Sequence, residues 1–124
     1  MKIILIAIMS ALLLMSAPMA ASAHGALSEM VTIIIHLNHY PTADDKKVLA
    51  DIAADPQATA GDKIIAGALM RMQHRVEGAD AVALRKLAAD DATPAAEKEL
   101  ATILLGITHH PSAGDIAHLK TLAE

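Results

Sequence analysis

The chain has 124 residues and a formal net charge of −4, and it contains no cysteine, tryptophan or phenylalanine. A mildly acidic chain without a basic cluster is a poor ligand for nucleic acid or an anionic membrane, so both are excluded as main partners. Without disulfides, stability must come from packing alone. Since Tyr40 is the single aromatic residue, the core must be built from aliphatic side chains and methionine, which favours packed helices.

Residues 1–23 follow the plan of a secretory signal peptide, with Lys2, an apolar run over residues 3–15 and the small-residue ending Ala21-Ser22-Ala23. We expect cleavage after Ala23. Because Lys2 leaves with the leader, residues 24–124 then form one domain with a formal charge of −5. An uncleaved membrane anchor is the alternative, and Pro18 argues against it. The sequence therefore predicts a periplasmic or secreted protein with no stable membrane association after cleavage.

The chain that follows the leader predicts six helices, over residues 26–38, 43–54, 60–73, 79–89, 94–108 and 113–123. A hydroxyl residue three positions before an aspartate predicts a capping box at a helix start. This pattern occurs at Thr42 with Asp45, Thr59 with Asp62, and Ser112 with Asp115. Thr93 before Pro94 predicts a different start, an N-cap followed by proline at the first helical position.

An internal repeat has a period of 35 residues. A shift by this amount aligns three histidines, three aspartates and three leucines. They are His39, His74 and His109, Asp45, Asp80 and Asp115, and Leu49, Leu84 and Leu119. The same register aligns the strand-like run 31–35 with residues 64–72 and 100–107, whose apolar spacing is helical, so we expect a helix there too.

The repeat predicts an all-α fold: three αα-hairpin repeats in a short right-handed helical-repeat, or solenoid-like, domain. This architecture resembles the tetratricopeptide and related solenoid families, although the Trp, Leu-Gly and Tyr signature is absent and no family residue is carried over. In an open stack the central unit is covered on both sides. Truncating Leu84 to alanine is therefore expected to cost more than truncating Leu119.

The first predicted helix has an apolar arc of about 200°, too wide for an end helix packed on one side. We therefore expect a second cover over this helix, either a protein partner, a second copy of the chain or an uncleaved leader. The predicted interface residues are Val31, Ile33 and Ile35.

The recurring histidine closes the first helix of each repeat, with an aspartate six residues later. One interpretation is structural: each imidazole meets the negative end of the helix dipole and bridges to the capping aspartate or to a loop carbonyl. The other is a histidine row, formed by His39, His74 and His109, that binds a transition metal. The spacing alone leaves both open.

Further metal ligands are available in His110, next to His109, and in His36, on one helix face with His39. Imidazole ligands favour Cu, Zn or Ni. Cleavage after Ala23 would also place His24 at the amino terminus, where its amine and imidazole can chelate Cu(II). This resembles the amino-terminal histidine brace of secreted copper proteins.

No nucleophile setting, glycine-rich phosphate loop or haem-attachment motif is present in the sequence, so we do not expect an enzyme. The sequence predicts an exported helical-repeat protein that binds another protein or self-associates. A periplasmic protein that binds a transition metal through histidines is the alternative prediction.

Overall fold

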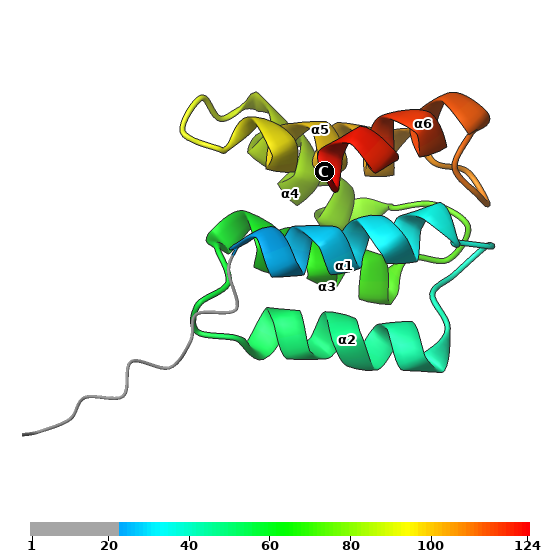
Figure 1. Ribbon diagram of the computed structural model, residues 1–124, viewed down its shortest axis with the longest axis horizontal. Helices are drawn as coiled ribbons and strands as arrows, with labels where there is room; N and C mark the ends of the chain where they lie inside the picture. The colour runs from blue at the N-terminus through cyan, green and yellow to red at the C-terminus, as the bar shows by residue number, and fades with distance from the viewer. Residues whose placement is uncertain (1–22) are drawn as a thin grey trace, which may run out of the picture.

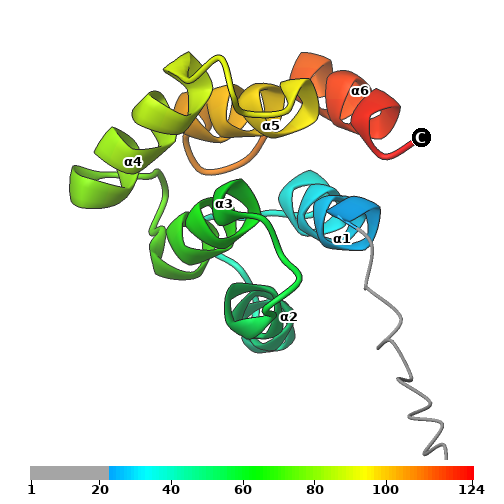
Figure 2. The ribbon, with the colours of Figure 1, turned by 90° about the vertical axis from the view of Figure 1, so that its left-hand side faces the viewer.

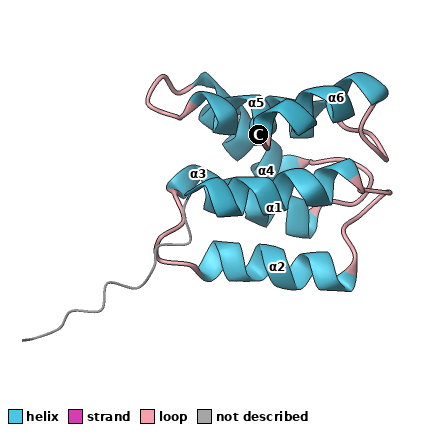
Figure 3. Cartoon of the chain, in the orientation of Figure 1, coloured by secondary structure: helices cyan, strands magenta, loops and turns pink. Residues whose placement is uncertain are grey.

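The computed structural model describes residues 23–124, with side chains from Gly25 onward, so the predicted leader lies outside the described residues except for Ala23. This part of the chain is all-helical, as expected, and contains no strand (Figure 3). The six helices are α1 (Ala23–Ile35), α2 (Ala43–Ala54), α3 (Ala60–Arg71), α4 (Gly78–Ala89), α5 (Ala95–Gly106) and α6 (Ala113–Leu122). None of these helices is long and apolar enough to span a bilayer.

The helix starts follow the capping chemistry of the sequence. All three predicted capping boxes are formed, with the hydroxyl accepting from the backbone N–H of the aspartate and the carboxylate accepting from the backbone N–H of the N-cap. The predicted N-cap at Thr93 is wrong by one residue, because Pro94 takes that position and α5 begins at Ala95. Capping residues therefore located four of the six helix starts to within one residue.

The three inner helices α1, α3 and α5 contact one another, and α2, α4 and α6 lie outside them (Figure 2). Extensive contacts join α2 to α3 and α4 to α5. The three loops that connect an inner helix to the next outer helix, residues 36–42, 72–77 and 107–112, lie at one end of the molecule, on the right in Figure 1. The loops 55–59 and 90–94 lie at the opposite end.

The first helix packs against the last, since α1 contacts α6 as well as α2, α3 and α5. An open right-handed solenoid is therefore not confirmed, because its two ends would lie apart. The contacts also account for the wide apolar arc of α1 within one chain: Val31 and Ile33 are buried in the core, and Ile35 is half-buried against it. Association through these residues stays a prediction of the sequence.

Aliphatic side chains from all six helices form one core. The recurring leucines of the outer helices, Leu49, Leu84 and Leu119, are each 0% exposed. The end helices are thus buried as fully at this position as the central one, which is the packing expected when the helices close on themselves.

Replacing Leu49, Leu84 or Leu119 with alanine should lower the free energy of unfolding by comparable amounts, within about 2–5 kcal/mol, because all three side chains are fully buried. Urea denaturation of the three variants measures this. A much smaller loss for Leu119→Ala than for Leu84→Ala would contradict the packing of α6 against α1.

Candidate metal centre

Three histidines meet at the end of the molecule that carries the inner-to-outer loops. The Nδ1 atoms of His39 and His74 are 3.0 Å apart, those of His74 and His109 are 3.1 Å apart, and those of His109 and His39 are 3.0 Å apart. The rings meet edge to face, with centroids 4.9–5.0 Å apart. His39 is half-buried and the other two are exposed, so the cluster lies at the surface.

Each histidine is the central residue of a tight backbone turn. The residue after it donates a hydrogen bond to the carbonyl of the residue before it, which is a γ-turn. The donors and acceptors are Tyr40 to Asn38 (2.9 Å), Arg75 to Gln73 (2.7 Å) and His110 to Thr108 (2.9 Å). The φ angles of the histidines are 67–69°, a conformation that costs a non-glycine residue about 1–3 kcal/mol.

Backbone hydrogen bonds connect the three histidines in a closed ring. The N–H of His39 donates to the carbonyl of His109 at 2.6 Å, that of His74 to His39 at 2.8 Å, and that of His109 to His74 at 2.6 Å. Loops far apart in the sequence are therefore joined at the histidines themselves. This ring fixes the positions of the three Cα atoms from which the imidazoles extend.

A buried apolar residue lies two positions before each histidine and anchors the loop to the core. These residues are Leu37, Met72 and Ile107, all 5% exposed or less. The predicted inner helices extend too far here, to residues 38, 73 and 108, whereas the helices end at Ile35, Arg71 and Gly106. The chain leaves the helix so that the apolar residue faces the core and the histidine enters its turn.

Hydrogen bonds alone cannot satisfy the three Nδ1 atoms. A neutral imidazole nitrogen either carries a proton and donates, or has a free lone pair and accepts. Among three nitrogens in mutual contact, at least two must be of the same kind, so one of the three contacts is always between two donors or two acceptors. A cation shared by three lone pairs satisfies all of them at once.

Desolvation lowers the pKa of the His109 imidazole, and the neighbouring His39, His74 and His110 lower it further. The shift favours the neutral imidazole, since nearby imidazolium charges would repel one another. Neutral imidazole is also the form that ligates a metal. The electrostatics of the cluster therefore favour the ligand form of His109.

The other histidines predicted as metal ligands are engaged elsewhere. The Nδ1 atom of His36 lies 2.9 Å from the carbonyl of Thr32, and that of His110 lies 3.1 Å from the carbonyl of Pro111. His24 lies in α1, in the part of the helix whose side chains are not described. His39, His74 and His109 are thus the predicted ligands that the structure brings together.

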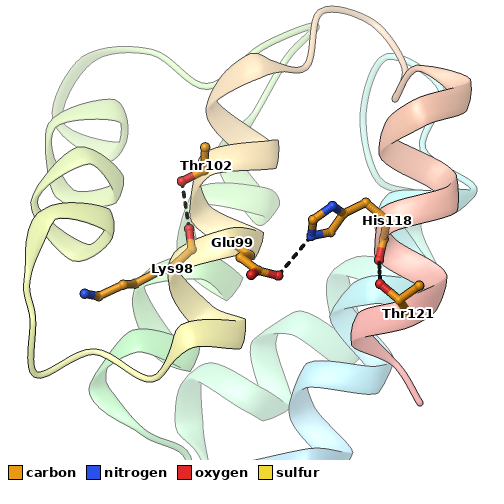
Figure 4. Close-up of polar contacts among 5 residues, drawn as sticks. All are labelled: Lys98, Glu99, Thr102, His118 and Thr121. Atoms are coloured by element: carbon orange, nitrogen blue, oxygen red, sulfur yellow. Dashed lines mark hydrogen bonds and ion pairs between the residues drawn. The ribbon is translucent and has the colours of Figure 1, made fainter.

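His118 was not among the predicted ligands. Its ring on α6 reaches Glu99 on α5, with Nε2 2.9 Å from Oε2 (Figure 4). Both side chains are about half exposed, so the pair contributes little to stability. A histidine outside the cluster with a separate partner gives a natural control for experiments on the cluster.

The bridge from each recurring imidazole to the aspartate six residues later, one part of the structural interpretation, is not formed. Asp45 and Asp115 cap their own helices, and Asp80 accepts two hydrogen bonds from Arg71, at 2.6 and 2.9 Å. The sequence analysis did not predict the Arg71–Asp80 pair, which joins the end of α3 to the start of α4 across the loop that contains His74. The side chain of Arg71 lowers the pKa of Asp80 through these hydrogen bonds.

A second polar feature lies at the opposite end, where Asp62 and Glu97 begin α3 and α5. They are 1% and 6% exposed. The Thr59 hydroxyl donates to Glu97 Oε1 at 2.7 Å, whereas Asp62 Oδ1 is buried without a partner. Gly61 lies against Glu97 Oε2, and a Cβ atom there would collide with it. The 35-residue register aligns Asp62 with Glu97, the one signal that could have predicted this pair.

Burial raises the pKa of the Glu97 carboxyl; the hydrogen bond from Thr59 opposes the shift and the charge of Asp62 adds to it. A cavity of about 420 Å³ adjoins Glu97, lined also by Lys86 and Asp90. With two carboxyl groups and no third ligand, this end of the described chain forms no metal cluster. We expect the two buried carboxyl groups to affect the free energy of unfolding.

Replacing His74 with glycine should give a more stable metal-free protein than replacing it with alanine, by about 1 kcal/mol, because only glycine adopts a φ of 67° without strain. Urea denaturation of both variants in the presence of a chelator gives the difference. Equal stabilities would mean that the positive φ is not a strained feature of the native loop.

Replacing Glu97 with glutamine should raise the free energy of unfolding at pH 7.5 by about 1–3 kcal/mol, the usual cost of a buried group without full partners. Because the native pKa is raised, the protonated carboxyl supports folding at acidic pH, and this support is lost as the pH rises through the native pKa. The gain should therefore vanish near pH 4. Replacing the exposed Glu99 with glutamine is the matched control, and it should change the free energy of unfolding by no more than about 0.5 kcal/mol at either pH. A stability gain of Glu97→Gln that is the same at both pH values would contradict the raised pKa of Glu97.

Protein-family models, curated proteins and solved structures were each compared with the chain, and none matches it. The arrangement of the three histidines is therefore the main observation from which a function can be proposed.

Proposed function

We propose that this protein binds one first-row transition-metal ion through the Nδ1 atoms of His39, His74 and His109. The observation that carries the proposal is the convergence of three nitrogens to 3.0–3.1 Å from one another. Imidazole nitrogen is a common ligand of Zn, Cu and Ni. A cation bound by all three lone pairs also removes the unfavourable contact between two donors or two acceptors that remains when only protons are shared.

The spacing of the nitrogens suits an ion of this size. With bonds of about 2.0–2.1 Å to each nitrogen, the ion lies about 1 Å out of the plane of the three Nδ1 atoms. Three ligands then occupy one side of the ion. Since a structural zinc site normally has four protein ligands, three histidines at a surface favour a site with an open coordination position.

Preorganisation supports the same function. The histidines are held in strained turns by backbone hydrogen bonds and by the buried apolar residue two positions before each of them. Strain of this kind is retained at binding and catalytic sites more often than elsewhere. A ligand set fixed before binding loses less conformational freedom when the ion enters, which strengthens affinity.

We also propose that the three helix pairs are copies of one 35-residue unit closed into a ring. The shared γ-turn, the equal burial of the recurring leucines and the contact of α1 with α6 support this arrangement. Export, and binding to a protein partner or to a second copy, stay predictions of the sequence. A metal site at the surface is compatible with both.

Titration of residues 24–124 with Zn²⁺, Cu²⁺ and Ni²⁺ by calorimetry tests the metal site, with an expected stoichiometry of one ion per chain. Replacing His39, His74 or His109 with glutamine should weaken binding by more than the roughly 10- to 100-fold that loss of an outer-shell partner costs. Each variant should lose a similar amount, because the three ligands are equivalent in geometry.

His118→Gln and His36→Gln are the matched controls and should leave the affinity unchanged, since neither side chain is in the cluster. A stoichiometry of one that survives all three cluster substitutions would place the ion elsewhere. If the chain binds none of the three metals, the proposed function is overturned.

A further inference from the structure

The histidine cluster borders a cavity of about 580 Å³. It is lined by His74 itself together with Tyr40, Lys46, Met70, Arg71 and Gln73. This volume lies in the range of small-molecule sites, about 300–1,000 Å³. A member of the cluster, His74, therefore lines a space large enough for a small organic molecule.

The charge around this cavity is positive although the whole chain is acidic. Three neutral imidazoles leave both charges of a divalent ion uncompensated, and no carboxylate lines the cavity. Arg71 is paired with Asp80, whereas no carboxylate of the described residues lies within ion-pair distance of Lys46. A metal ion and an ammonium group beside one cavity attract an anion.

We propose that a small organic carboxylate binds in this cavity, with one oxygen on the open coordination position of the metal and its charge opposite Lys46. The inference rests on the proposed metal function. Tyr40 and Gln73 offer hydrogen bonds at the cavity wall, and Met70 offers an apolar surface for the carbon chain. The combination of a charged anchor, a few polar groups and an apolar wall is typical of small-ligand sites.

The test uses the protein loaded with Co²⁺, whose visible absorption changes when a ligand joins the coordination sphere. Titration with acetate should give a saturable spectral change, and the metal-free protein should bind no acetate. Lys46→Met should weaken acetate binding about fivefold, the effect of losing one partly exposed ion pair. The affinity for Co²⁺ itself should stay within twofold.

Lys47→Met is the matched control, because Lys47 is the next residue and instead pairs with Asp44, outside the cavity. It should leave acetate binding unchanged. Equal acetate affinities in wild type and Lys46→Met would overturn the role of the cavity, and so would equal losses in the two lysine variants.

The outcomes separate this inference from the metal function. If Co²⁺ binds with a stoichiometry of one and acetate leaves the spectrum unchanged, the carboxylate site is overturned and the metal site stands. If the spectrum instead changes with protein concentration, a second chain supplies the ligand and the carboxylate site is again overturned. If Co²⁺ does not bind, both fail.

Discussion

The hydrogen-bonded ring formed by the main chains of His39, His74 and His109 is the constraint on which the arrangement of the other parts depends. Each member belongs to a loop between an inner and an outer helix, so the ring holds the ends of α1, α3 and α5 at fixed separations. Inner helices held in this way contact one another. The last outer helix then lies beside the first inner one, which completes the cover of the core.

The turns that form this ring destabilise the native state, because each places a histidine at positive φ. Three non-glycine residues at positive φ together destabilise the native state by about 3–9 kcal/mol, at about 1–3 kcal/mol each. A domain of this size has a net stability of only about 5–15 kcal/mol. Glycine at the same positions would remove most of the strain and keep every backbone hydrogen bond. The backbone of these turns therefore does not require histidine, which supports the proposal that the imidazoles are retained for binding a metal.

Much of the secondary structure could be predicted from local chemistry. The capping boxes and apolar spacing located six helices, and the 35-residue register placed His39, His74 and His109 at equivalent positions. The closure of α1 on α6 could not be predicted, because an open and a closed stack present the same apolar pattern within each helix pair. The convergence of the imidazoles depends on that closure and on positive φ angles, which a histidine in the sequence does not signal. Glu97 was missed because an acidic residue in the first turn of a helix is favoured by the helix dipole at the surface, and nothing in the sequence signals its burial.

The three turns are alike at the histidine and differ at the residue that follows it. The backbone is the same in the three turns, and the central residue of each turn is a histidine, so the proposed site would offer an ion three equivalent nitrogens. The next residue is Tyr40 in one loop, Arg75 in the second and His110 in the third. These side chains give the three sides of the cluster different surroundings, and a cavity is lined by His74. The equivalent turns thus hold the three proposed ligands alike, whereas the different residues that follow them would let a second ligand of a bound metal approach from one side in preference to the other two.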